Sequence, residues 1–98
     1  MSLTNLISIA AALPDAWRSR VLARIGGANV TVLRMDGAAY DEECHPYDEG
    51  LLVLDGVMRL VIGGETIAVG AGELYVVPAG RPHAVAPGSH GTLVILDV

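Results

Sequence analysis

Short apolar segments separated by glycine and proline make up most of the chain from residue 28 onward. The predicted strands are residues 30–35, 50–54, 57–62, 65–69, 73–77, 81–86 and 92–98. Strands of about five residues, repeated every ~8–12 residues, are typical of a sandwich or barrel. No segment has the long helical period that a parallel βαβ unit requires. We therefore expect an all-β fold in which closure of the sheet protects apolar strand edges.

Glycine-containing pairs mark the turns between these strands. Asp55-Gly56 lies between two apolar runs, which is among the strongest local signals for a hairpin. Gly63-Gly64 predicts a second hairpin in the same way. Asp36-Gly37 and Pro78-Ala79-Gly80 predict further turns, because these residue types favour turn conformations. The chain is thus expected to reverse direction many times with short connections.

The N-terminal part, residues 5–27, has the least regular pattern. Its apolar residues between Leu6 and Leu13 fit either a strand or a short helix, and Pro14-Asp15 predicts a turn after them. We expect Trp17, the sole tryptophan, to cover one end of the core rather than to stack on a ligand.

Length and composition set the domain organisation. A chain of 98 residues, 52% hydrophobic and 17% charged, is expected to form one folded domain over residues 1–98. Residues 1–27 would be an N-terminal arm with a first strand or turn, and residues 28–98 the barrel core. A domain this small commonly buries an apolar face against a twin, so we expect a homodimer with residues 6–13 as the interface or exchanged arm.

Charge and cysteine content exclude several classes of partner. The net charge is −5, lysine is absent and the six arginines are scattered, which argues against nucleic acid or an anionic membrane as a partner. No apolar run approaches the ~20 residues of a membrane span, and no basic residue precedes residues 6–13 as in a signal peptide. A single cysteine, Cys44, excludes a disulfide framework. We expect a cytoplasmic protein with a small-molecule ligand or substrate.

Two segments contain the candidate chemistry, residues 41–49 and 72–83. Alternate side chains of a strand share a face, so Glu43 and His45 would point one way and Cys44 the other. Glu49 opens the next strand and His83 follows the turn at residues 78–80, so all four can meet inside a barrel. Two imidazoles with one or two carboxylates suit a divalent ion such as Zn, Fe, Mn, Ni or Co. A hydrated acidic bend with hydrogen-bonded histidines is the alternative.

The spacing of these residues resembles the two signature segments of the cupin superfamily, especially its small single-domain members. The first segment, G-x5-H-x-H-x3,4-E-x6-G, corresponds to Gly37, Glu43, His45, Glu49 and Gly56. The second segment, G-x5-P-x-G-x2-H-x3-N, corresponds in order to Gly72, Pro78, Gly80, His83 and Pro87. The resemblance covers roughly residues 28–98. It implies a single-domain cupin β-barrel, also called a double-stranded β-helix or jelly roll.

The resemblance also implies a metal site, with two departures from the family pattern. His45, Glu49 and His83 match ligand positions, whereas Glu43 stands where the family has its first histidine and would be an altered ligand. Pro87 replaces the final asparagine. A register one residue away would instead turn Glu42 and Cys44 inward, because a slip of one residue exchanges the faces of a strand.

Several functions are compatible with this resemblance. Cupins include dioxygenases, sugar-phosphate isomerases, epimerases and decarboxylases, and the fold does not choose among them. The first hypothesis is a metal-dependent enzyme acting on a small molecule, of unassigned reaction. The alternatives are a non-catalytic binding or sensing module with a degenerate metal site, and a structural barrel. We expect Arg34, Arg59 and His90 to be surface residues, although the two arginines would suit an anionic substrate.

Overall fold

The computed structural model describes residues 3–98, so Met1 and Ser2 of the predicted domain lie outside the described residues. One short helix, α1 (Leu6–Ala12), precedes the strands. The strands are β1 (Arg20–Ile25), β2 (Ala28–Asp36), β3 (Tyr40–Glu43), β4 (Glu49–Ile62), β5 (Glu65–Gly70), β6 (Leu74–Val77), β7 (His83–Val85) and β8 (His90–Asp97). The fold is all-β, as the sequence predicts. No helix among residues 3–98 is both long and apolar enough to cross a membrane.

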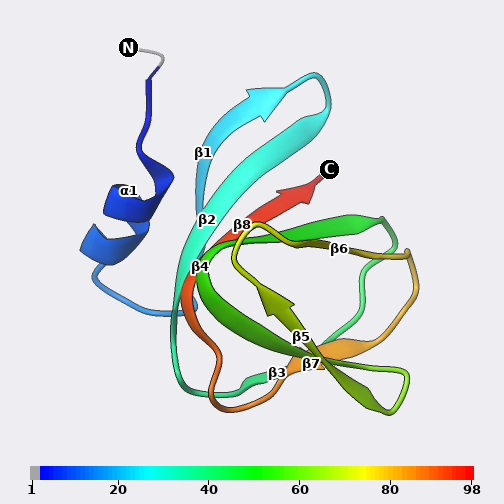
Figure 1. Ribbon diagram of the computed structural model, residues 1–98. Helices are drawn as coiled ribbons and strands as arrows, with labels where there is room; N and C mark the ends of the chain where they lie inside the picture. Colours follow the sequence, from blue (N-terminus) through cyan, green and yellow to red (C-terminus); the bar gives the residue numbers. More distant parts are fainter. Residues whose placement is uncertain (1–2) are drawn as a thin grey trace.

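The strands form one antiparallel sheet that curls into two facing layers (Figure 1). Its hydrogen-bonded order is β1-β2-β8-β4-β7-β3, and β5 and β6 also pair with β4. The first half of β4 pairs with β6 and β8, and its second half pairs with β5 and β7. β4 therefore connects the two layers. The curl brings Glu49, the first residue of β4, close to His83, the first residue of β7. β1 and β3 lie at the two ends of the hydrogen-bonded strand order.

The predicted hairpin at Asp55-Gly56 is wrong. These two residues lie inside the continuous strand β4, and the pairing of β4 with β8 runs through them from Gly50 to Val57. The register shifts between Val53 and Asp55, which is a β-bulge that bends the strand toward the second layer. Gly56 has φ of 76°, a conformation that suits a bulge as well as a tight turn. The residue types alone therefore did not distinguish a hairpin turn from a bulge at Asp55-Gly56.

The hairpin at Gly63-Gly64 is confirmed. Ile62 pairs with Glu65 across this two-residue turn, and the two glycines have φ of 59° and 77°. Positive φ at both central positions matches the twist of the adjoining strands, and glycine adopts it without steric cost. This hairpin places β5 beside the second half of β4.

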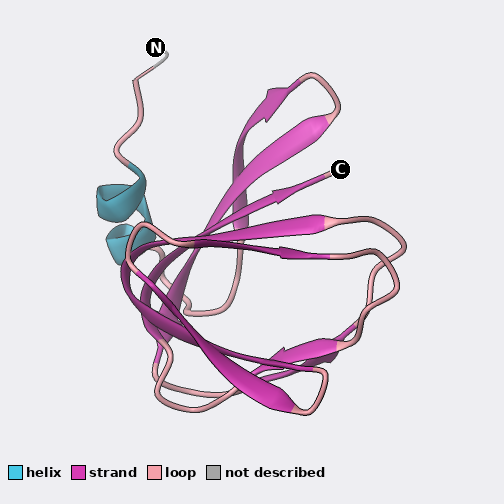
Figure 2. Cartoon of the chain, turned by 45° about the vertical axis from the view of Figure 1, so that its right-hand side comes forward, coloured by secondary structure: helices cyan, strands magenta, loops and turns pink. Residues whose placement is uncertain are grey.

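Two apolar clusters stabilise the sheet. The main core lies between the layers and includes Val53, Met58 and Leu60, all fully buried. The second cluster lies on the outer face of β2 and β8, where α1 lies against the sheet (Figure 2). There Ala10 packs against Val32 and Val94. The N-terminal apolar run is thus a helix, and it packs on its own sheet.

Candidate metal centre

Four side chains from separate elements meet at one end of the barrel. Glu43 ends β3 and is the register partner of His83, which opens β7. His45 lies in the loop after β3, and Glu49 is the first residue of β4. The Nε2 atom of His45 lies 3.3 Å from Oε2 of Glu43 and 3.6 Å from Oε2 of Glu49. The Nε2 atom of His83 lies 3.2 Å from Oε1 of Glu49.

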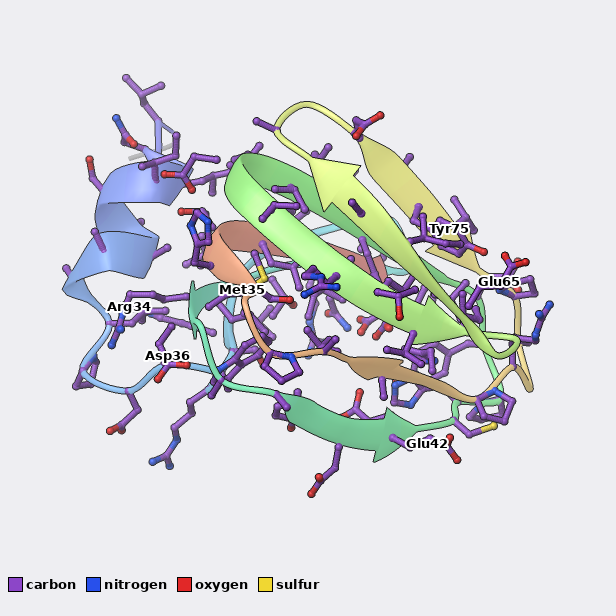
Figure 3. The ribbon with its side chains drawn as sticks, turned by 60° about the horizontal axis from the view of Figure 1, so that its bottom comes forward. Arg34, Met35, Asp36, Glu42, Glu65 and Tyr75 are labelled. Atoms are coloured by element: carbon purple, nitrogen blue, oxygen red, sulfur yellow. The ribbon has the colours of Figure 1, made fainter. Side chains whose placement is uncertain are left out.

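The orientation of residues 42–45 matches the first of the two registers considered above. Glu43 and His45 line the same pocket, whereas Cys44 is exposed. Glu42 is also exposed and lies on the outer side of β3 (Figure 3). Cys44 is therefore not available as a ligand within this pocket.

His83 has a fixed tautomer, which determines what it presents to the site. Its Nδ1 atom lies 3.0 Å from the carbonyl oxygen of Arg81, an atom that can only accept, so Nδ1 carries a hydrogen and donates it. In the neutral ring Nε2 then has a free lone pair. That lone pair faces a carboxylate oxygen of Glu49, which is another acceptor. Two acceptors this close require a proton or a metal ion to bind them.

His45 is held by ring stacking as well as by the carboxylates. Its ring lies parallel to that of Tyr47, with centroids 5.0 Å apart and an interplanar angle of 7°. The ring of His83 meets the ring of His45 edge-on, with centroids 5.6 Å apart. Stacking on Tyr47 restricts the His45 ring, so its Nε2 atom stays directed toward the two glutamates.

Glu49 is the buried acid of this group. Only 6% of the residue is exposed, and burial raises the pKa of its carboxyl above the usual range, although His45 and His83 oppose the shift. A buried carboxylate is unfavourable unless a cation or hydrogen-bond donors compensate its charge. A divalent ion would supply that compensation.

The donor set fits a divalent metal ion. One ligand atom each from Glu43, His45 and His83 lie within 4.8 Å of one another, and Glu49 offers an oxygen to each histidine. The hydrogen bond from His83 to a backbone carbonyl is the kind of outer contact that orients metal-binding imidazoles. These four residues could therefore hold such an ion.

The four side chains open into a cavity of about 380 Å³. Apolar residues of the main core, including Leu51, Met58 and Leu93, form part of its lining. Its other walls carry polar and aromatic side chains from the inner faces of β2 and β8 and from the segment before β1. The cavity is within the range of small-molecule sites in proteins.

Trp17 packs against the core as expected, but it also faces the cavity. There its ring contacts that of Tyr40, with centroids 5.5 Å apart. Its backbone has φ of 64°, an unfavourable conformation for a bulky residue. Hydrogen bonds keep it there, from its backbone N–H to the Arg34 carbonyl oxygen and from Nε1 to Oδ1 of Asp36 at 2.7 Å.

The remaining candidate residues lie outside the cavity. Arg34 is half-buried and donates to the carbonyl oxygen of Leu13, and exposed Arg59 donates to that of Pro87. His90 is exposed. The sequence reasoning did not single out Asn29 and Asp97, which line the cavity together. The alternation of side chains along β2 and β8 could have indicated them, because both lie at positions that face inward.

These observations define a class of protein, a small antiparallel β-domain with histidine and carboxylate side chains at the open end of a curled sheet. The sequence profile of the cupin domain matches residues 31–98. The chain therefore belongs to the cupin family, and its fold and the resemblance seen in its sequence are confirmed.

Individual relatives agree with this family. A cupin-2 domain containing protein from Shewanella frigidimarina is 21% identical, with a TM-score of 0.86 over 96% of this chain and 92% of that one. A protein of unknown function from Streptococcus pyogenes is 26% identical, with a TM-score of 0.82 over 99% and 86% of the two chains. Among curated proteins, quercetin 2,3-dioxygenase of Bacillus subtilis is 40% identical over 47 residues. Those residues are 48% of this chain and only 14% of the dioxygenase.

Proposed function

We propose that the protein holds a divalent metal ion with Glu43, His45, Glu49 and His83 and uses it to transform a small molecule bound in the adjoining cavity. The observation that carries this proposal is the arrangement of His83. Its tautomer directs a lone pair at a buried carboxylate oxygen 3.2 Å away, and a metal ion satisfies both atoms at once.

The donor types narrow the choice among Zn, Fe, Mn, Ni and Co. Glu43, His45 and His83 supply the two histidines and one carboxylate typical of non-haem iron(II) oxygenases, and Glu49 would add a second carboxylate beside them. The dioxygenase relative supports the same class of chemistry. We therefore propose iron(II) as the first ion to test and oxidation of a small organic molecule as the first reaction class.

The protein's own groups would orient the ligand and exclude water. When bound, the metal ion would act as a Lewis acid toward an oxygen atom of the substrate. Leu51, Met58 and Leu93 provide an apolar lining that would exclude water from the ligand. The Tyr40 hydroxyl lies beside Glu43, whose charge raises the pKa of that phenol, so Tyr40 stays protonated and can donate toward the glutamate.

Metal titration of histidine variants tests the proposal. Calorimetry of chelator-treated protein with iron(II), manganese(II), zinc(II), nickel(II) and cobalt(II) should show one ion per chain. His83→Ala should lose at least about 100-fold in affinity, because a ligand matters more than the outer contacts that contribute 10–100-fold. His90→Ala removes an exposed histidine and is the matched control. Equal affinity in the two variants, or no binding by the unaltered protein, would contradict the proposal.

Oxygen consumption by the iron-loaded protein tests the catalytic part separately. Turnover of an organic substrate that is lost in His83→Ala supports an enzyme. Tight metal binding without turnover of any compound that binds in the cavity assigns instead a non-catalytic binding or sensing cupin.

We also propose that the chain forms a homodimer through the outer face of the layer that contains β6. Leu74 and Val76 of β6 are 53% and 55% exposed there, and Leu74 pairs with Leu52 of the outer apolar cluster. A second copy would cover these side chains. Sedimentation equilibrium should show a dimer at micromolar concentration that Leu74→Glu dissociates, whereas a monomeric unaltered protein would overturn this proposal.

A further inference from the structure

The cavity walls have side-chain charge of one sign. Three carboxylates line it, those of Glu43, Glu49 and Asp97. Among the described residues 3–98, which include all six arginines, no arginine lines the cavity, and the chain has no lysine. Once a metal is bound, the two histidines that line the cavity are its neutral ligands and carry no positive charge. A phosphate or carboxylate group on a ligand would therefore meet no cationic side chain.

Asp97 is the carboxylate that the metal centre does not use. It lies on β8, and Oδ1 accepts a hydrogen bond of 3.1 Å from Nδ2 of its β2 partner, Asn29. Leu96 pairs with Gly50 on β4, so Asp97 comes one position beyond that pair, in the direction of Glu49. A divalent ion would balance the two glutamates, and Asp97 would then leave the cavity with one uncompensated negative charge.

Aromatic rings surround the same space. Tyr40, Tyr47 and Trp17 all line the cavity. Asp97 lines the cavity together with these rings. The faces of aromatic rings attract cations, and a carboxylate beside such rings strengthens that attraction. Negative charge and aromatic surface without a basic group are the features that select an organic cation.

We propose that the cavity takes a small organic amine, whose ammonium group lies against Asp97 and the aromatic lining while the rest of the molecule faces the metal centre. The proposal rests on the proposed function, because the bound ion leaves Asp97 as the uncompensated charge. It disfavours an anionic group at the Asp97 end of the cavity, and it gives Asp97 the role of a specificity determinant.

Three compounds of similar size test the sign of the preferred charge. They are 2-phenylethylamine, 2-phenylethanol and 3-phenylpropionate, which present a cation, a neutral group and an anion on the same ring. Binding to the metal-loaded protein is followed by the fluorescence of Trp17, the sole tryptophan, which lies in the cavity wall. The amine should bind at least about 10-fold more tightly than the alcohol and about 100-fold more tightly than the acid, since a charged hydrogen-bonded pair outweighs a neutral one.

Two variants identify the group responsible. Asp97→Asn keeps an oxygen for the Asn29 amide but removes the charge, and it should bring the amine and the alcohol to within about threefold of each other. Glu65→Gln removes the same charge from an exposed residue of the β4–β5 hairpin, outside the cavity (Figure 3), and should preserve the order. Equal binding of the three compounds, preference for the acid, binding of none, or equal effects of the two variants would each overturn the proposal.

The same titrations on chelator-treated protein separate this proposal from the metal proposal. A protein that binds metal but shows no preference for the amine loses only the inference about Asp97. A protein that binds no metal but prefers the amine through Asp97 keeps that inference and loses the metal centre.

Discussion

β4 contributes to two regions that use polar groups in opposite ways. At its centre, where it bends between the layers, Asp55 Oδ1 accepts a hydrogen bond of 2.6 Å from the backbone of Thr92, and Gly56 crosses close to the backbone of His90. At its beginning, Glu49 faces the Nε2 atoms of two histidines. The bend has donors for its acceptors within the chain, whereas the open end gathers carboxylates and imidazoles whose charge a cation would balance.

This difference separates stability from binding along a single strand. A buried polar group with a partner in the chain stabilises the fold, and removing that partner exposes the full cost of desolvation. A group of converging acceptors instead costs stability until a cation arrives. Substitutions at the bend should therefore affect unfolding, and substitutions at the open end should affect metal binding with a small gain in stability of the metal-free protein.

The largest effect is expected for Gly56→Ala at the bend. The added Cβ would overlap the carbonyl oxygen of His90, a backbone atom that cannot move independently. With the cost of positive φ for alanine, the free energy of unfolding should fall by about 4 kcal/mol in urea denaturation.

Gly64→Ala is the matched control for that measurement. Gly64 has φ of 77°, against 76° for Gly56, and a Cβ at Gly64 would meet nothing within 4 Å. It should therefore cost only about 1 kcal/mol, the price of the backbone conformation alone. Equal losses for the two variants would show that close strand crossing at the bend does not matter.

A smaller loss of stability is expected for Asp55→Ala. This change leaves the backbone N–H of Thr92 without its charged acceptor, so the free energy of unfolding should fall by about 2 kcal/mol. Asp55→Asn retains an oxygen in place and should lose about half as much. Thermal or urea unfolding at pH 7 distinguishes the two, and an alanine variant as stable as the unaltered protein would refute the comparison.

The smallest effect, of opposite sign, is expected for Glu49→Gln at the open end. Burial raises the pKa of Glu49 in the folded chain above its unfolded value. The resulting stabilisation is present below the unfolded pKa, near 4.3, and is lost as pH rises through the folded pKa. Glutamine does not ionise, so metal-free Glu49→Gln should be more stable at pH 7 by on the order of 1 kcal/mol, and the difference should shrink as pH falls toward 4.

Addition of metal to that variant sharpens the comparison. The divalent ion should stabilise the unaltered protein more than Glu49→Gln, because the glutamine amide is a weaker ligand than a carboxylate. Urea denaturation with chelator and with added ion provides both values. A glutamine variant that is less stable without metal would show that Glu49 already has sufficient donors in the chain.

The sequence predicted correctly those features that depend on adjacent residues, and it failed where a feature depends on the pairing of distant strands. The Gly63-Gly64 hairpin was predicted because the turn depends on two adjacent residues, both with positive φ. The hairpin at Asp55-Gly56 was wrongly predicted because the same residue pair suits a bulge, and only the pairing of β8 with β4 through Asp55-Gly56 decides between them. The meeting of Glu43, His45, Glu49 and His83 followed from motif spacing, and their binding of a metal stays a prediction.

By itself, the sequence determined the strand-rich fold, most of its turns and the spacing that directs residues 43, 45, 49 and 83 to one place, because these depend on alternation and on glycine positions. Only the tertiary structure decided that Trp17 and Asp97 line the cavity and that, among residues 3–98, no arginine does. Those properties depend on which distant strands become neighbours when the sheet curls, and pairing between distant strands leaves no local pattern.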